Sequence, residues 1–179
     1  MNYKIMGRFV GKILMVEAVF MVPALFIALA RGEGDAVRGF LLSILAIVLL
    51  AGILLLLARK SNKSFYAREG LACVGLSWIV MSLMGGLPFW ISGAIPSFVD
   101  AFFETVSGFT TTGASILTAV EQMEKSLLYW RNFTNWLGGM GVLVFLLAIS
   151  STGAGDNGFT IHLLRAESPG PNVGKLVPR

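Results

Sequence analysis

The sequence predicts an all-α membrane protein in which two leading transmembrane helices precede one helix–pore-loop–helix repeat. Of the 179 residues, 55% are hydrophobic and only 13% are charged, an apolar excess that is typical of membrane proteins and not of soluble domains. The apolar residues gather into four long runs. Between the third and fourth runs, a short helical pattern ends in small hydroxyl residues and glycine.

The first two runs are each long enough to cross a bilayer, which takes about 20 apolar residues. One covers residues 9–30, and the other covers residues 39–58 with almost only Leu, Ile, Val and Ala. The end of the first run also fits a signal-peptide cleavage site, but Glu17 and Pro23 interrupt its apolar character and favour a retained helix. We therefore assign residues 1–60 to two leading transmembrane helices.

The third and fourth runs contain small residues that predict close helix packing. Residues 70–91 end in Gly-Gly-Leu-Pro at positions 85–88, which predicts a thin and kinked helix end. Residues 127–149 carry Gly-Gly-Met-Gly at positions 138–141, which predicts a smooth face. Together with the segment between them, these runs form the expected repeat, residues 61–150.

Basic residues predict the orientation, because short cytoplasmic loops are enriched in Lys and Arg. They lie before the first run and between the second and third runs: Lys4, Arg8, Arg59, Lys60, Lys63 and Arg68. We therefore expect a multi-pass protein of the inner (plasma) membrane with a cytoplasmic N-terminus. Residues 151–179 then form a cytoplasmic linker, which includes a short amphipathic helix at residues 159–165.

Several other classes of function are not supported. The net charge of +4 does not indicate nucleic-acid binding, because the basic residues form no face interleaved with aromatic residues. Cys73 is the single cysteine, so a disulfide or a cysteine-based metal site is not expected, and His162 has no partner ligand in register. No nucleophile, base and acid converge. We expect neither an enzyme nor a bound cofactor.

The stretch between the third and fourth runs has the dimensions of a re-entrant loop. Ser97 is placed to cap a helix over residues 98–107, which Gly108 is expected to end. Such a helix is about 15 Å long, half the hydrocarbon thickness, and an extended return over residues 109–117 covers a similar depth. The alternative is an external Thr-rich turn, because irregular backbone at membrane depth must line water or be buried in protein.

Backbone carbonyls and glycine in this loop suit a cation path, because oxygen ligands replace the hydration shell of an alkali ion. The residues with this chemistry are Thr110, Thr111, Thr112 and Gly113. Glu104 is expected to hydrogen-bond the backbone behind the loop, with direct ion ligation as the alternative.

Three further sets of polar residues each have two interpretations. For Glu17 we favour packing or snorkelling over pairing with Lys12 or contact with an ion path. For Arg131 we favour an interfacial anchor over a gate. Asn132, Asn135 and Gly139 share one helix face, and they either line a cavity below the loop or pack against the preceding short helix.

Several motifs in order resemble the Trk/Ktr/HKT superfamily of potassium transporters, specifically the bacterial TrkH-like membrane subunit. They are Gly-Leu-Pro-Phe at residues 86–89, the stretch at 103–115, Trp-Arg at 130–131 and Trp-Leu-Gly-Gly-Met-Gly at 136–141. Residues 167–179 resemble the first cytoplasmic linker of that family. The resemblance covers the whole chain but only about the first third of a family member.

The resemblance implies potassium uptake through a filter built from four repeats, of which this chain carries one. It implies a filter segment with potassium bound at the carbonyls of Thr111 and Thr112 and with Glu104 and Gly108 as filter support; the segment comprises Thr110, Thr111, Thr112, Gly113 and Ala114. The expected partners are lipid, the remaining repeats, a second subunit as a homodimer, and a cytoplasmic nucleotide-binding regulatory ring of the TrkA/KtrA kind. Symport with protons or sodium is left open.

Two alternatives are compatible with the residues alone. One is a complete small subunit whose four copies assemble a homotetrameric potassium channel. The other is a non-conducting membrane scaffold whose loop never closes on an ion path. The linker-like residues 167–179 favour a segment of a larger subunit over the homotetramer.

Overall fold

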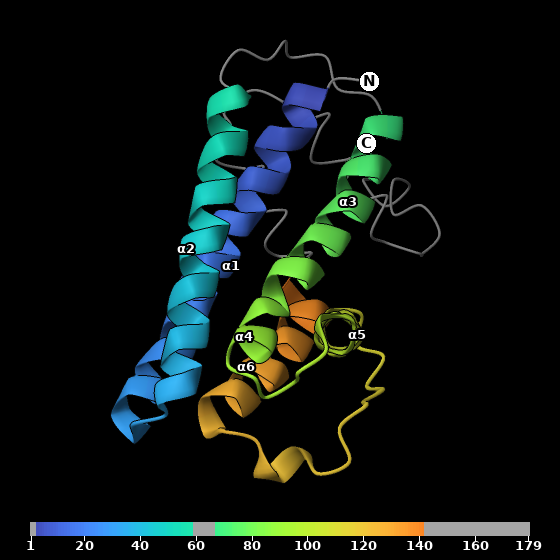
Figure 1. Cartoon of the computed structure of the whole chain (residues 1–179). Helices are drawn as coiled ribbons and strands as arrows, with labels where there is room; N and C mark the ends of the chain where they lie inside the picture. The colour runs from blue at the N-terminus through green and yellow to red at the C-terminus, as the bar shows by residue number, and fades with distance from the viewer. Residues whose placement is uncertain (1–2, 59–66, 142–179) are drawn as a thin grey trace, which may run out of the picture.

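The computed structural model describes residues 3–58 and 67–141, and every regular element in these ranges is a helix (Figure 1). In chain order the elements are α1 (Tyr3–Arg31), α2 (Gly34–Leu57), α3 (Ala67–Gly85), α4 (Leu87–Ile91), α5 (Phe98–Phe109), η1 (Val120–Gln122), α6 (Lys125–Trp136) and the π-helical turn η2 (Leu137–Gly141). The all-α membrane class is confirmed. The end of the fourth apolar run, the predicted helix at residues 159–165 and His162 lie outside the described residues.

Three segments are long and apolar enough to cross a membrane: Lys4–Arg31, Gly34–Leu57 and Ala72–Ile91. They correspond to the first three predicted spans. Helices α1 and α2 form an antiparallel pair, and α3 packs against α1 (Figure 1). The turn between α1 and α2 places Gly32 at φ +69°, in the left-handed region that glycine adopts without steric cost.

The third span is interrupted at the Gly-Gly-Leu-Pro motif, as its sequence predicts. Helix α3 ends at Gly85 and α4 begins at Leu87, with Pro88 in the first turn. Proline is tolerated there because the amide N–H groups of a first helical turn have no intrahelical acceptor. The buried Cys73 lies in α3, within the apolar core.

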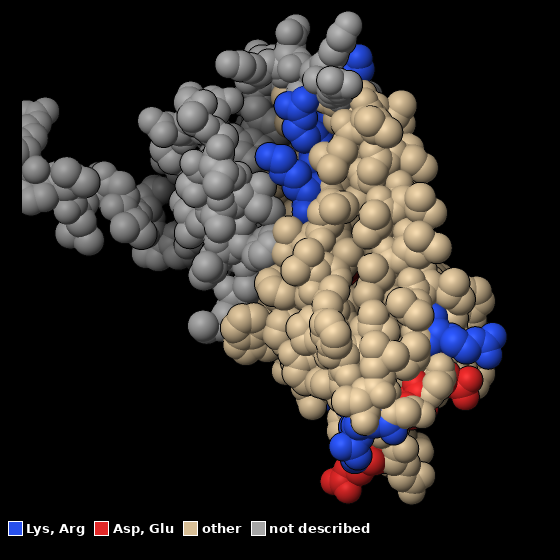
Figure 2. Space-filling model, turned by 90° about the vertical axis from the view of Figure 1, so that its left-hand side faces the viewer, with Lys and Arg blue, Asp and Glu red and all other residues tan. Residues whose placement is uncertain are grey.

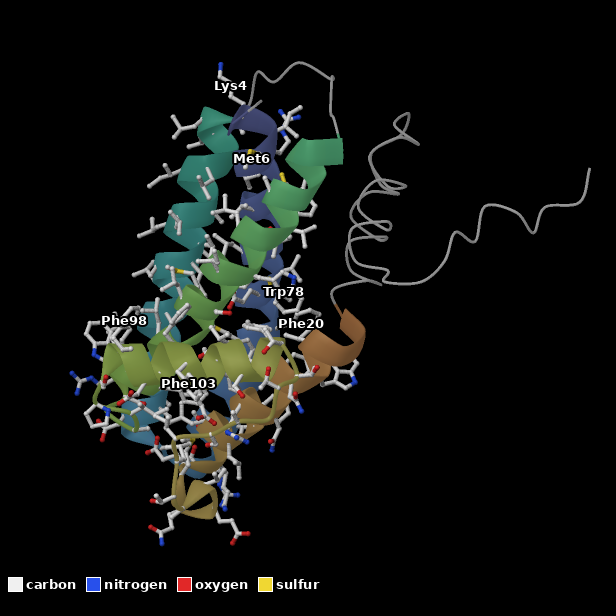
Figure 3. All side chains as sticks on the ribbon, turned by 90° about the vertical axis from the view of Figure 1, so that its right-hand side faces the viewer. Lys4, Met6, Phe20, Trp78, Phe98 and Phe103 are labelled. Atoms are coloured by element: carbon white, nitrogen blue, oxygen red, sulfur yellow. The ribbon has the colours of Figure 1, made fainter. Side chains whose placement is uncertain are left out.

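The short helix α5 begins where predicted but differs in its end and its direction. The hydroxyl of Ser97 accepts the amide N–H of Asp100 at 3.4 Å. Helix α5 continues one residue past Gly108, to Phe109, and Gly108 lies where a Cβ atom would overlap the hydroxyl of Thr134. Figure 3 shows α5 lying across the long axes of α1 to α3. The length of α5 therefore does not measure how deeply the chain enters the membrane along those axes. The expectation that this helix spans half the hydrocarbon thickness was wrong.

Exposed charged groups lie toward the two ends of the bundle (Figure 2). On the face shown in Figure 2, Lys and Arg gather toward one end, while both signs of charge lie near the other. At the basic end, Arg8 donates a 2.9 Å hydrogen bond from Nη2 to the carbonyl of Ala58. Ala58 is the C-cap of α2, and a cation there complements the negative end of the helix dipole.

At the opposite end, Glu33 joins the leading helix pair to the repeat. Its two carboxylate oxygens accept the backbone N–H groups of Lys125 and Ser126, each at 3.0 Å. These are the first two residues of α6, so Glu33 caps a helix 92 residues away in sequence. Burial raises the pKa of Glu33, but the bonds from Ser126 and Lys125 and the charge of Arg31 outweigh it and lower the pKa overall.

Replacing Glu33 by Ala removes this cap and is expected to lower the stability by about 1 kcal/mol, the usual contribution of an N-cap. Thermal unfolding in detergent micelles measures the effect. The folded-state pKa of Glu33 is lowered. Its contribution to stability is therefore full when the pH is above the ordinary pKa of a glutamate, and it is lost as the pH falls through the lowered folded-state pKa. The difference between E33A and the unchanged protein should therefore shrink in acid.

The matched control is Glu121→Ala, which removes the same charge from an exposed residue of η1 near the start of α6. It should leave the unfolding temperature unchanged. Equal effects of E33A and E121A would show that Glu33 acts through net charge and not as a cap.

Candidate pore loop

The kinked end of α3 is the point at which α5 and α6 dock. A Cβ atom on Gly85 would lie 2.9 Å from Cγ2 of Thr105 and 3.1 Å from the ring of Phe109. A Cβ atom on Gly86 would lie 3.1 Å from the Ala101 carbonyl oxygen. From α6, Nε1 of the buried Trp130 donates a 2.9 Å hydrogen bond to the Gly85 carbonyl. The missing side chains thus allow α5 to approach α3 closely.

Helices α5 and α6 are also joined by glycines. A Cβ atom on Gly108 would overlap the hydroxyl of Thr134, and one on Gly138 would overlap the carbonyl of Phe109. Gly139 follows at the edge of the loop, where a Cβ atom would lie 3.8 Å from Cγ2 of Thr111. The predicted smooth face of the fourth run therefore lies against the end of α5.

After α5, residues 110–119 leave helical structure and return along the outside of the bundle (Figure 1). Two of them have left-handed backbone torsions, Thr111 at φ 55° and Gly113 at φ 75°. Glycine adopts this region freely, whereas a β-branched residue does so only where its surroundings enforce it. Strain of this kind is concentrated at ligand clamps and active sites.

Hydrogen bonds from α5 hold the start of the loop. The amide N–H of Thr111 bonds to the Gly108 carbonyl and that of Thr112 to the Ser107 carbonyl, both at 3.0 Å. The Ser107 hydroxyl donates to the Ala114 carbonyl at 2.5 Å. These bonds tie both ends of the Thr110 to Ala114 segment to the last turns of α5.

Glu104 holds the rest of the returning chain. Its buried carboxylate accepts the hydroxyl of Ser115 at 3.0 and 3.1 Å and the amide N–H of Ile116 at 3.2 Å. It also accepts Nε of Arg131 at 2.5 Å, which forms an ion pair between α5 and α6. The expected role of Glu104 in supporting a filter remains a prediction, but its bonds to the loop are present.

Two charged residues lie in places that the sequence did not predict. Arg131 was expected as an interfacial anchor, but its side chain turns inward and is only 22% exposed. Glu17 was expected to pack or snorkel near the inner interface; it is buried, as packing requires, but it lies well inside α1, which begins at Tyr3. Contacts between side chains on different helices leave no periodic pattern in the sequence. Residue spacing therefore could not predict the position of Arg131 or of Glu17.

The five predicted filter residues are brought together on an exposed face. The side chains of Asn132 and Asn135 on α6 are exposed as well. Among the described residues, no group of three His, Cys, Asp or Glu side chains forms a metal-ligand set. The oxygens of residues 110–114 are carbonyls and threonine hydroxyls, a kind of hard ligand that suits alkali cations.

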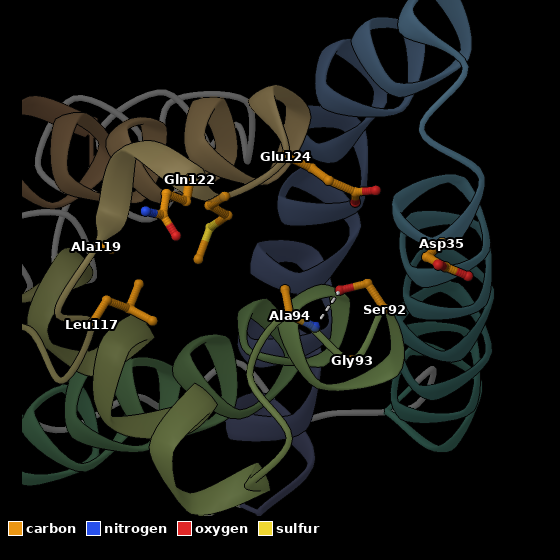
Figure 4. A pocket seen from close by; sticks show the side chains of 9 residues that line it. Asp35, Ser92, Gly93, Ala94, Leu117, Ala119, Gln122 and Glu124 are labelled. Atoms are coloured by element: carbon orange, nitrogen blue, oxygen red, sulfur yellow. Dashed lines mark hydrogen bonds between the residues drawn. The ribbon is translucent and has the colours of Figure 1, made fainter.

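Sequence reasoning missed an acidic hollow on the side of the molecule where the chain returns (Figure 4). This cavity of about 380 Å³ is lined by Asp35, Ser92, Gly93, Ala94, Leu117, Ala119, Gln122, Met123 and Glu124. Burial raises the pKa of Glu124, and the charges of Glu33 and Asp35 raise it further.

These features define a class of protein. Three helices long and apolar enough to span a membrane, with only helices as regular elements in the described ranges, define an all-α membrane protein. Comparison with known proteins gives the family.

The chain belongs to the TrkH family of cation transport proteins, which matches residues 37–176. It is 35% identical to the Trk system potassium uptake protein TrkH of Halomonas elongata and 34% identical to that of Escherichia coli K12, each over the whole of this chain and 37% of the relative. It also superposes on the crystal structure of the potassium transporter TrkH from Vibrio parahaemolyticus with a TM-score of 0.74 and 32% identity. That match covers 83% of this chain and 32% of the other.

The glycine contacts between α5 and α6 predict that Gly108→Ala is strongly destabilising. The new methyl group would overlap the Thr134 hydroxyl, and overpacking of a close contact typically costs about 1–3 kcal/mol. Thermal unfolding in micelles measures this loss. Gly52→Ala in α2 is the control, because a Cβ atom there meets nothing within 4 Å. A tolerated Gly108→Ala would contradict the packing.

The ion pair between Glu104 and Arg131 predicts a large effect of Arg131→Met. Without the guanidinium, Glu104 keeps a buried charge with fewer partners, which costs about 3 kcal/mol for buried pairs. The double variant E104Q/R131M should be less destabilised than the sum of the two single changes.

The control for this cycle is Arg31→Met. Arg31 pairs with Glu33 at 3.3 Å but is 56% exposed, and such surface pairs contribute about 0–1 kcal/mol. Additive effects of E104Q and R131M would show that the two side chains do not interact.

Proposed function

We propose that this chain forms the first part of a potassium uptake subunit and contributes one wall of its selectivity filter. The observation that carries the proposal is the loop itself. Thr111 and Gly113 both have left-handed torsions, and the loop is held at Ala114 by Ser107 and at Ser115 and Ile116 by Glu104. A backbone held in this way is suited to direct its carbonyls at a dehydrated ion.

The proposed ligands are the carbonyl oxygens of Thr111 and Thr112, flanked by Thr110, Gly113 and Ala114. Helix α5 ends directly at this segment, so its C-terminal carbonyls add negative potential where a cation would sit. The relatives are named for potassium uptake, which favours potassium as the ion. Glu104 and Gly108 would then support the filter without contacting the ion.

The remaining walls would come from the rest of the subunit, because the chain spans only about 37% of the length of the curated relatives it matches. We further propose a homodimer in the inner membrane with the basic end, including Lys4 and Arg8, in the cytoplasm. A cytoplasmic nucleotide-binding regulatory ring would dock on that side. The proposed activity is transport and not catalysis.

Gly113→Asp in the complete subunit tests the filter assignment. An aspartate at φ 75° is strained, and its carboxylate changes the charge of the ion path, so selective potassium uptake should be lost while the protein still reaches the membrane. Growth at low potassium and the ratio of potassium to sodium uptake in cells that lack other potassium transporters are the measurements.

Gly32→Asp is the matched control, because Gly32 has a similar φ of 69° but lies in the turn between α1 and α2. It introduces the same charge and the same strain outside the loop, and uptake should persist. Selective potassium uptake by the Gly113→Asp protein would refute the assignment. An unchanged subunit that assembles but moves no potassium would favour a non-conducting scaffold.

A further inference from the structure

Glu17 is a buried carboxyl group that the proposed filter chemistry does not use. Only 1% of its surface is exposed, and among the described residues neither carboxyl oxygen has a hydrogen-bond partner. A buried polar group left without a partner is destabilising, and a polar residue inside a membrane span is by default a candidate for function. The position therefore calls for an effect of this side chain on its neighbours that offsets the cost of burial.

The carboxyl group lies in the notch where α3 meets the end of α5. A Cβ atom on Gly85 would lie 2.9 Å from Oε1 of Glu17, 2.9 Å from Cγ2 of Thr105 and 3.1 Å from the ring of Phe109. Glu17 thus reaches from α1 into the space that Gly85 leaves open. Phe109 is the last residue of α5, and Thr110 follows it as the first residue of the loop.

Neighbouring contacts connect the same notch to both sides of the loop. Trp78 of α3 meets Phe109 edge to face, with ring centroids 6.4 Å apart, and Trp78 and Phe20 are labelled in Figure 3 near the end of α5. Phe20 of α1 meets Phe133 of α6 at 5.4 Å. Helix α1 therefore packs against α6 and beside the end of α5, the two helices that flank the loop.

We propose that Glu17 is a positioning residue for the filter: its carboxyl group sets where the last turn of α5 lies against Gly85, and thereby where residues 110–114 stand. The proposal rests on the proposed function. It makes the leading helix α1 a determinant of ion selectivity and not only a membrane anchor. The required feature is the shape of the side chain, which glutamine shares, and not its ionisation.

The size of the Glu17 side chain matters because Thr105 and Phe109 of α5 lie in the same notch. Shortening Glu17 to Ala opens a cavity beside Phe109 and Thr105, and surrounding side chains relax into such spaces. Phe109 is joined directly to the loop, so its relaxation displaces Thr110 and Thr111. The bonds of Glu104 to Ser115 and Ile116 hold only the far side of the loop and do not compensate.

The experiment compares Glu17→Gln, Glu17→Ala and the control Val19→Ala in the complete subunit. Potassium and sodium uptake and the amount of subunit in the membrane are measured in cells that lack other potassium transporters. Val19 lies on the same helix and is 62% exposed, so its truncation should change nothing. We expect Glu17→Gln to keep the potassium-to-sodium ratio and Glu17→Ala to lower it by about fivefold.

A Glu17→Ala protein with slower uptake but unchanged selectivity would overturn the proposal, because a merely structural residue affects amount and not discrimination. Loss of uptake in Glu17→Gln would also overturn it, since the ionisable group itself would then be required. If Glu17→Ala does not accumulate, Glu17→Asp withdraws the carboxyl group from the notch and is expected to lower selectivity in the same direction. Failure of the unchanged subunit to move potassium would instead reject the proposed function.

Discussion

The structure depends on one close contact, the meeting of four helices at Gly85. The notch beside Gly85 receives Glu17 from α1 and Thr105 and Phe109 from α5. The carbonyl of Gly85 accepts the indole N–H of Trp130 from α6. Any residue larger than glycine at position 85 would collide with these side chains. Because lipid provides no hydrophobic force between helices, association in a membrane relies on such small-residue contacts and on buried hydrogen bonds. The place of α5, and of the loop it carries, follows from this contact.

The charged groups then fix the loop and the ends of the bundle. Glu104 binds the returning chain and Arg131 together, so one buried carboxylate links α5, the loop and α6. At the end of the bundle where α1 and α2 are connected, Glu33 caps α6 from the turn after α1. Both are contacts between parts of the chain far apart in sequence. The bonds of Glu104, with that of Ser107 to Ala114, give the short loop of exposed threonines a defined backbone, which carbonyl ligation of an ion requires.

The sequence predicted the elements well and their mutual contacts poorly, for physical reasons. Hydropathy and length identify spans because a bilayer demands them, and Ser97 marked the start of α5 because capping is local. Gly108 was misjudged as a terminator, since a glycine within a helix and one at its end look alike without a neighbour such as Thr134. The inward turns of Arg131 and Glu17, and the transverse direction of α5, depend on distant partners that no periodicity reveals. The chemistry of residues 110–113 suggested a cation path, and the family resemblance suggested a potassium filter. The family match confirms the resemblance, while the ion contacts remain predictions.

The central claim is that the backbone of the strained loop, and not an acidic side chain, holds the ion. A structure of the complete subunit with rubidium in place of potassium, with the ion located by its anomalous scattering, tests it most directly. We expect a rubidium peak within ligand distance of the carbonyl oxygens of Thr111 and Thr112. A peak only in the acidic hollow beside Asp35 and Glu124, with none at the loop, would contradict it.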